Sequence, residues 1–178
     1  MSNQTVLKIT DRLKSELWEH LIGNEPESEN AAFLFVKEKI SGKETIYNVV
    51  DWYPVPENGF FFKSDYHIEL SDETIAKVIK KSHDLNTCLV EVHSHLGQEN
   101  VRFSASDFWG FKEFVPHVLW RLKDRPYLAV VTSTEGGFDG LVWKSANEPV
   151  QLDNILTETE ILEATGASLL RIGELDEE

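Results

Sequence analysis

The sequence contains a single cysteine, Cys88, so no disulfide can form within the chain. This cysteine lies in an apolar run, where a buried and unreactive thiol is the default interpretation. Because nothing in the chain depends on disulfides, we expect it to work in a reducing compartment. Internal repeats and low-complexity blocks are also absent.

Long apolar segments are missing as well. The N-terminal residues 1–12 lack a basic start followed by an apolar block, which excludes a signal peptide. No apolar run approaches the roughly 20 residues that a membrane-spanning helix needs. We therefore expect a soluble, cytoplasmic protein with no membrane partner.

Basic residues are scarce: 17 lysines and arginines stand against 31 acidic residues, which gives a net charge of −14. Such a surface repels phosphate backbones, so a nucleic-acid partner is not expected. A basic protein partner is one interpretation of this charge, and solubility alone is the more common one.

The remaining composition is that of a packed protein, with 41% apolar residues among 178. We expect one domain over residues 1–150 and an acidic tail over 151–178. Hydrophobic periodicity predicts helices at 11–22, 72–83 and 105–122, with another near 153–164 in the tail. It predicts strands at 6–9, 31–36, 46–53, 88–95, 127–132 and 138–144. This irregular mixture favours an α+β fold with a mixed β-sheet.

Two histidines, His93 and His95, lie two residues apart at the end of the strand predicted at 88–95. Since side chains in a strand repeat with a period of two, both imidazoles leave the same face, about 6–7 Å apart along the strand. Ser94 points to the other face. Two such rings can converge on one zinc ion at Zn–N distances of about 2.1 Å.

A catalytic zinc ion needs a third protein ligand and an open position for water. Asp107, in the first turn of the helix predicted at 105–122, is the best candidate. The helix dipole also favours an acidic residue there without any metal. Because the histidine pair leads directly into the loop before Asp107, we favour the ligand interpretation.

The order of these residues resembles the JAMM signature of MPN-domain (JAB-domain) zinc metallopeptidases, in particular of their stand-alone bacterial members. That signature is a glutamate before an apolar strand, then His-Ser/Thr-His, a loop, and Ser-x-x-Asp. The matching positions are Glu29, His93-Ser94-His95 and Ser104-Ala105-Ser106-Asp107. The resemblance spans residues 5–145.

The chain departs from the usual pattern at three points. Leu96 stands where the family usually has proline, and Ala32 where it often has glycine. The loop over 96–103 is one residue longer than usual. These departures concern the surroundings of the site rather than the five signature residues.

The resemblance implies an MPN/JAB-like (cytidine-deaminase-like) mixed sheet flanked by helices. It implies that His93, His95 and Asp107 bind one Zn²⁺ per chain, that Glu29 is the general base, and that Ser104 donates a hydrogen bond to the oxyanion. The implied reaction is cleavage of a peptide or isopeptide bond at the C-terminus of ubiquitin or a ubiquitin-like modifier. The modifier or its conjugates would then be the partner.

Without the resemblance, the sequence does not decide which glutamate is the general base. Glu25 and Glu27 share the acidic loop of Glu29, and Glu91 shares the strand face of His93, where it could be a ligand or a partner of that histidine. Ser104 and Ser106 are alternative caps of the following helix. We expect structural or exposed roles for His20, His67, His83 and His117, and core positions for Trp109, Phe111, Phe114 and Trp120.

Other families with a His-x-His metal site fit less well. Metallo-β-lactamases need an aspartate and a further histidine soon after the pair, and residues 96–99 supply neither. Amidohydrolase barrels need about 250 residues, and cupins lack helices between their strands. Two alternative functions stay open: a non-catalytic MPN scaffold that binds a protein partner, and a hydrolase of small amides or peptides.

Overall fold

The computed structural model of this chain describes residues 3–23 and 26–176. The helices in these ranges are α1 (Asp11–Ile22), α2 (Asp72–Leu85), α3 (Ala105–Arg121) and α4 (Ala167–Asp176). The main strands are β1 (Gln4–Lys8), β2 (Ala31–Ser41), β3 (Glu44–Pro54), β6 (Cys88–His95), β7 (Tyr127–Ser133), β8 (Phe138–Trp143), β9 (Val150–Gln151), β10 (Asn154–Leu156) and β11 (Ile161–Glu163). A short 3₁₀ helix, η1 (Glu57–Gly59), leads into a separate hairpin of β4 (Phe60–Lys63) and β5 (Ile68–Leu70). None of these helices is long and apolar enough to cross a membrane.

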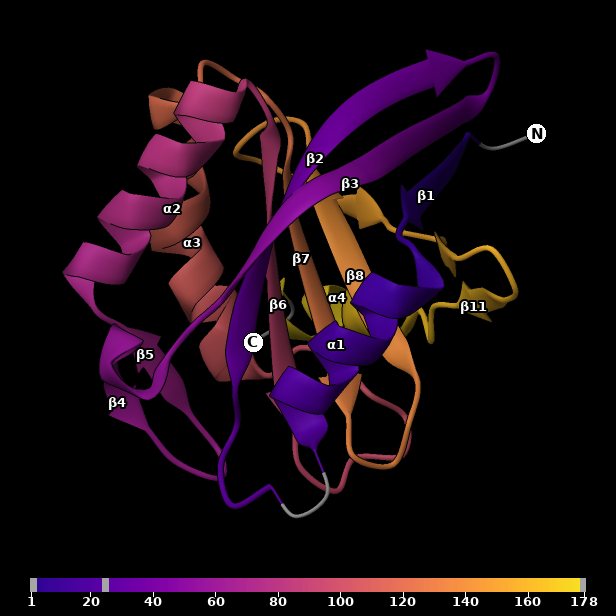
Figure 1. The fold of residues 1–178 in the computed structure, drawn as a ribbon. Coiled ribbons are helices and arrows are strands. Elements are labelled where there is room, and N and C mark those ends of the chain that lie inside the picture. Colours follow the sequence, from indigo (N-terminus) through magenta and orange to yellow (C-terminus); the bar gives the residue numbers. More distant parts are fainter. Residues whose placement is uncertain (1–2, 24–25, 177–178) are drawn as a thin grey trace.

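The main strands form one curled mixed sheet in the order β11-β10-β1-β3-β2-β6-β7-β8-β9 (Figure 1). The pairs β1–β10, β1–β3 and β6–β7 are parallel, and the other pairs are antiparallel. Helix α1 covers one face of the sheet, and α2 and α3 cover the other. The prediction of an α+β fold with a mixed sheet flanked by helices is therefore confirmed.

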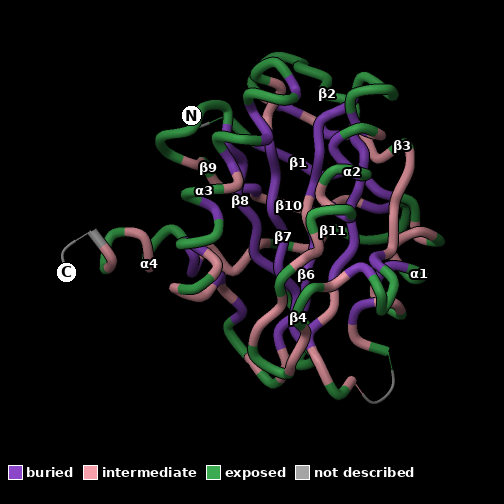
Figure 2. Tube along the Cα trace, turned by 90° about the vertical axis from the view of Figure 1, so that its left-hand side faces the viewer, coloured by how far each residue is buried: buried purple, intermediate pink, exposed green. Residues whose placement is uncertain are grey.

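Each face of the sheet buries its own apolar core, and the inner strands are buried along most of their length (Figure 2). Strand β6 shows how its residues divide between the cores. Leu89 packs into the core under α2 and α3, whereas Val90 and Val92 pack into the core under α1. Because strand side chains alternate, His93 and His95 share the face of Leu89.

The predicted elements before residue 145 are confirmed, and the strand predicted at 88–95 has the observed bounds of β6. The strand predicted at 31–36 is the buried half of β2, whose outer half over 37–41 is exposed. Hydrophobic runs mark only the buried half, because the exposed half is held by its pairing with β3. The hairpin of β4 and β5 was not predicted.

The helix predicted near 153–164 is wrong. In its place, β10 pairs in parallel with β1, and β11 pairs with β10. A tight turn over 157–160, closed by the Thr157 N–H on the Glu160 carbonyl at 3.0 Å, interrupts any helix there. The edge of β1 offers unpaired backbone groups, and a strand satisfies them where a helix would not. The main sheet thus extends beyond residue 150.

Two aromatic residues of α3 are not in the core, contrary to expectation. Trp109 and Trp120 are 67% and 72% exposed, whereas Phe111 is buried and Phe114 packs edge-on against Tyr127. The buried side of α3 is a single helical stripe, formed by Phe108, Phe111, Val115, Val118 and Leu119. The two tryptophans lie outside that stripe, so they remain at the surface.

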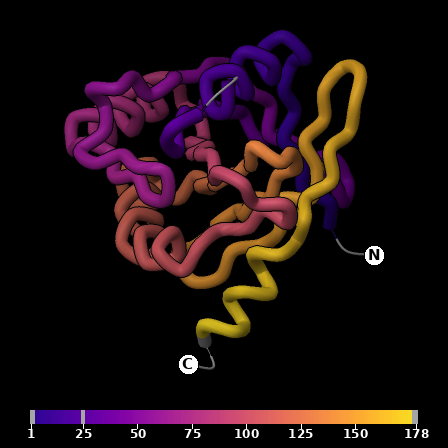
Figure 3. Tube along the Cα trace, turned by 90° about the horizontal axis from the view of Figure 1, so that it is seen from below, coloured from indigo at the N-terminus to yellow at the C-terminus, as the bar shows by residue number. Residues whose placement is uncertain are grey.

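The segment before α4 is tied to the core through Asp139, a fully buried residue of β8. Its carboxylate accepts hydrogen bonds from Gln151 Nε2 at 2.9 Å, Gly166 N at 3.2 Å and Ser168 N at 2.8 Å. The Ser168 hydroxyl in turn accepts the Phe103 N–H at 3.0 Å. The start of α4 therefore lies beside the end of the loop over 96–103 (Figure 3).

We expect Asp139→Ala to lower the free energy of unfolding by about 3 kcal/mol or more. The substitution leaves the backbone N–H groups of Gly166 and Ser168 without their acceptor, and each unsatisfied buried donor costs roughly 1–3 kcal/mol. The Gln151 amide loses one bond but keeps the Gly140 and Leu152 carbonyls as acceptors. Urea unfolding followed by circular dichroism measures the change. The matched control is Asp65→Ala at an exposed position, expected to stay within about 0.5 kcal/mol of the unmodified protein. Equal stability of the two variants would contradict the anchoring role of Asp139.

Candidate metal centre

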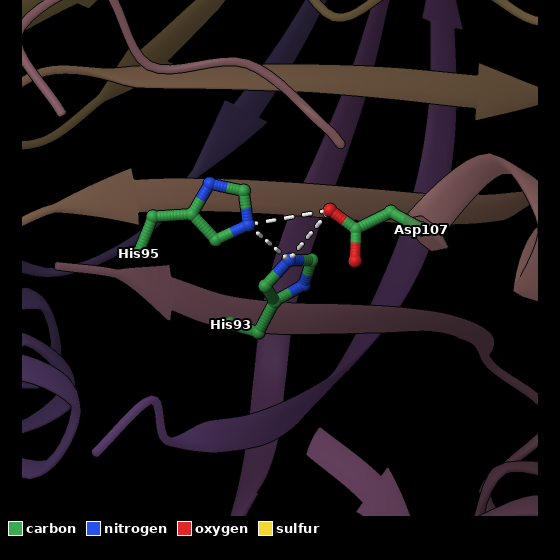
Figure 4. A group of neighbouring side chains, drawn as sticks. All are labelled: His93, His95 and Asp107. Atoms are coloured by element: carbon green, nitrogen blue, oxygen red, sulfur yellow. Dashed lines mark hydrogen bonds and ion pairs between the residues drawn. The ribbon is translucent and has the colours of Figure 1, made fainter. Parts of the chain in front are cut away.

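Three side chains from two elements converge at the C-terminal end of β6 (Figure 4). The Nε2 atoms of His93 and His95 are 3.2 Å apart. The Oδ2 atom of Asp107 lies 3.4 Å from the first nitrogen and 3.2 Å from the second. The structure thus brings together the three residues that the sequence predicts as metal ligands.

The strand positions the histidines and the helix start positions the aspartate. His93 lies opposite Ala31 of β2 and Val131 of β7, so its strand is fixed on both sides. Asp107 belongs to a capping box at the start of α3, in which Ser104 N–H donates to Asp107 Oδ2 at 2.8 Å. Strand pairing holds β6, and the capping box holds the start of α3. The fold itself therefore positions the three side chains.

Two further features hold the rings and the loop. Ser94 points to the opposite face, as expected, where its hydroxyl donates to the Leu21 carbonyl at 3.2 Å. The buried ring of Phe103 packs against His93 with 5.6 Å between the ring centres. The return of the chain from β6 to α3 is therefore packed against the site itself.

The Nδ1 atoms of both histidines face other side chains, so the Nε2 atoms are the ones that point toward each other and Asp107. His95 Nδ1 lies 2.9 Å from the amide oxygen of Gln98, which can only accept, so this nitrogen carries a proton. His93 Nδ1 faces Glu91 Oε1 at 3.4 Å. With a proton on Nδ1, a neutral imidazole presents a lone pair on Nε2, the form that binds a metal.

The three atoms fit a small tetrahedral cation. Bonds of about 2.0–2.1 Å to a tetrahedral ion place neighbouring ligand atoms about 3.3–3.4 Å apart. The observed separations of 3.2, 3.4 and 3.2 Å match that edge. Two imidazoles and one carboxylate are ligand types that zinc accepts, so these residues can hold a metal ion.

The electrostatics of the cluster favour a positive charge between these side chains. Burial acts to lower the pKa of His93, but the Asp107 and Glu91 carboxylates raise it well above its ordinary value. Burial likewise acts to raise the pKa of Asp107, yet His93 and His95 hold it far below its usual range. A proton or a metal cation is therefore stabilised at this position.

Glu29 lies beside the triangle without belonging to it. Its side chain is 7% exposed, and its Oε1 atom is 4.0 Å from His95 Nε2. Burial raises its pKa above the ordinary value, against the lowering effect of His93 and His95. Its backbone N–H donates to the Ser64 carbonyl at 2.8 Å, which links it to the hairpin of β4 and β5. A carboxyl group so placed can exchange protons with a ligand at the metal position.

The other candidate bases are placed differently. Glu27 is exposed, and Glu25 lies outside the described residues. Glu91 contacts the outer nitrogen of His93 rather than the side where the three ligand atoms converge. Among the candidates that the structure describes, Glu29 is thus the glutamate beside the metal-facing atoms.

Ser104, rather than Ser106, caps α3. Its hydroxyl oxygen accepts the Asp107 N–H at 3.1 Å, and its own proton is not engaged with any described residue. Ser106 is exposed, and its hydroxyl lies 3.4 Å from His67 Nδ1. Ser104 can therefore keep its capping bond and still donate its proton to a ligand.

The remaining histidines do not join the cluster in the described ranges. His20 Nε2 lies 2.8 Å from the Ala31 carbonyl, a contact between α1 and β2. His67, expected to have a structural or exposed role, contacts both Ser106 and Glu69. The sequence left Glu91 open as a ligand or a partner of His93, and the structure places it at the outer nitrogen of that ring. Gln98, the partner of His95, was not predicted, although it lies three residues from that histidine.

Comparison with known proteins adds little. No protein-family model matches this sequence, and no curated protein matches it. Among solved structures, the N-terminal domain of STIL from Trichoplax adhaerens is similar, with 12% identity and a TM-score of 0.36. The match covers 74% of this chain and 38% of that chain, so this chain spans well under two thirds of its length. So low a structural similarity carries no argument about function.

Proposed function

We propose that this protein is a zinc-dependent hydrolase of the JAMM type with an MPN/JAB-like fold. The observation that supports this most strongly is the triangle of His93 Nε2, His95 Nε2 and Asp107 Oδ2, with the buried Glu29 beside it. The proposed reaction is hydrolysis of a peptide or isopeptide bond at the C-terminus of ubiquitin or a ubiquitin-like modifier. The proposed setting is the cytoplasm.

In this proposal His93, His95 and Asp107 hold one zinc ion. Bound zinc supplies Lewis acidity, which polarises a carbonyl and lowers the pKa of water toward about 7. Glu29 accepts a proton from the attacking water and later gives it to the leaving amine. Burial raises the pKa of this carboxyl above its ordinary value, which makes it a stronger base. Ser104 donates its hydroxyl proton to the oxyanion of the tetrahedral intermediate.

A hydrolase is favoured over a non-catalytic scaffold by the assembly around the triangle. A scaffold that only binds a partner has no need for a buried carboxyl group 4.0 Å from a metal-facing nitrogen. Burying that group carries a desolvation cost, and such costs are typical of catalytic sites. The modifier is proposed from the resemblance of the five signature residues alone.

The test is hydrolysis by purified protein loaded with zinc. The substrates are a ubiquitin-like protein fused through its C-terminus to a lysine side chain or a peptide, and a short model peptide. We expect cleavage of the fusion that stops on chelation and returns with zinc. Cleavage of the short peptide alone would support the small-amide alternative, and zinc binding without any cleavage would support the scaffold.

A further inference from the structure

On the side of His93 that faces away from the metal position, Glu91 and Tyr127 form a chain of polar contacts that leads into the core. Tyr127 Oη donates a hydrogen bond to Glu91 Oε2 at 2.7 Å. The other oxygen of the same carboxylate, Oε1, faces His93 Nδ1 at 3.4 Å. Tyrosine, glutamate and histidine thus form a row that ends at a proposed metal ligand.

This row is buried, so its polar groups have few alternatives. Tyr127 is fully buried, the His93 side chain is 2% exposed and that of Glu91 is 16% exposed. His93 Nδ1 has no hydrogen-bond partner among the described residues, since 3.4 Å exceeds a good hydrogen bond. A buried donor of this kind is costly unless an acceptor moves onto it, and Glu91 is the acceptor that faces it.

The register of the sheet brings these residues to one face. Glu91 and His93 are alternate residues of β6, so they share one face of the sheet. Glu91 lies opposite Ala129 and Phe33 on the neighbouring strands, and Tyr127 belongs to the same face of β7 as Ala129. The small side chain of Ala129 leaves room for the tyrosine hydroxyl to reach the carboxylate.

The two histidines therefore differ in what supports them. His95 Nδ1 is held at 2.9 Å by the neutral amide of Gln98, within a loop near the surface. His93 Nδ1 faces a carboxylate in the interior. A carboxylate behind a metal-binding imidazole fixes its tautomer and makes it a stronger ligand, and losing such a partner typically costs 10–100-fold in metal affinity.

We propose that Glu91, held in place by Tyr127, is a positioning residue of the metal centre: it accepts the Nδ1 proton of His93 and so presents the Nε2 lone pair to the metal. This inference rests on the proposed metal centre. Glu91 touches neither the metal position nor a substrate; it acts through His93.

The chain offers a matched control for a purely structural role. Tyr47 is also fully buried, and its hydroxyl donates to Glu38 Oε2 at 2.9 Å. That pair has the same tyrosine-to-glutamate hydrogen bond as Tyr127 and Glu91, although Glu38 is exposed, and no described histidine contacts Glu38. Glu38→Ala thus removes the same kind of bond without touching the metal centre.

The experiment is titration of the metal-free protein with Co²⁺, followed by its visible absorption, and then competition with Zn²⁺. We expect Glu91→Ala to weaken both affinities by about 10–100-fold and to alter the Co²⁺ spectrum. Glu91→Gln keeps an acceptor oxygen, so its loss of metal affinity is expected to be smaller than that of Glu91→Ala. Tyr127→Phe keeps Glu91 but removes the hydrogen bond that holds it, and its metal affinity is expected to lie between those of the wild type and Glu91→Ala. Glu38→Ala is expected to bind both metals like the wild type.

Circular dichroism and urea unfolding confirm that each variant is folded, and Tyr127→Phe provides the answer if Glu91→Ala does not fold. Wild-type affinity in both Glu91→Ala and Tyr127→Phe would overturn this inference while leaving the metal centre intact. An equal loss in Glu38→Ala would also overturn it, because the effect would then be one of general stability. Failure of the wild type to bind either ion would instead refute the metal centre itself.

Discussion

Replacing Glu29 with glutamine is expected to abolish most turnover while leaving the zinc in place. The Glu29 carboxyl lies 4.0 Å from His95 Nε2 but does not belong to the group of side chains that could hold a metal ion. Glutamine has nearly the same shape and cannot take up a proton. General acid–base catalysis typically contributes 10²–10⁴-fold, so we expect a loss in kcat of about that size. Kinetics on the modifier fusion and zinc analysis of the same samples measure both effects.

The matched control is Glu27→Gln, in the same acidic loop but exposed. It changes the net charge by the same amount and is expected to keep full activity. If Glu29→Gln retained full turnover with full zinc occupancy, the proton transfer would have to be assigned to another group. Loss of zinc from Glu29→Gln would also contradict its placement outside the ligand set.

His95→Ala is expected to lower zinc affinity by more than about 100-fold, the upper value for removing only an outer partner of a ligand. The substitution takes away one corner of the triangle and leaves two protein ligands, fewer than zinc sites use. His95 is largely buried, with 9% of the residue exposed, so circular dichroism must first show that the variant is folded. Calorimetric titration with Zn²⁺ measures the affinity.

The control for His95→Ala is His117→Ala, which removes an exposed histidine of α3 far from the ligand set. It is expected to bind zinc like the wild type. Equal zinc binding by both variants would show that the ion, if bound, is held elsewhere.

The histidine pair and the apolar strand that carries it could be predicted because the information is local. Side-chain alternation along β6 places His93 and His95 on one face whatever the rest of the fold does. The start of α3 is equally local, since the capping box of Ser104 and Asp107 closes within three residues. That box also fixes Asp107, which is why the third corner of the triangle followed from the sequence.

The elements that sequence patterns missed depend on distant partners. Strand β10 exists because the edge of β1 lies beside it, and three residues of Asn-Ile-Leu carry no periodicity of their own. The hairpin of β4 and β5 is similarly short and interrupted at its bulge. The prediction of a helix near 153–164 failed because the local sequence does not report the pairing of this segment with β1.

The supporting contacts of the site are also long-range. Tyr127 reaches Glu91 across 36 positions of sequence, and Ser168 reaches Phe103 across 65. No spacing rule links such residues, because the pairing of β6 with β7 and the anchor at Asp139 bring them together. The ligands could therefore be predicted, whereas the contacts of Tyr127 and Ser168 could be found only in the structure.

The most direct test of the metal centre is a crystal structure of the zinc-loaded protein with anomalous diffraction data at the zinc edge. The account predicts one anomalous peak per chain, bonded to His93 Nε2, His95 Nε2 and the Asp107 carboxylate, with Glu29 next to it but not bonded. Zinc bound by other side chains, or no peak in protein that has been saturated with zinc, would contradict it.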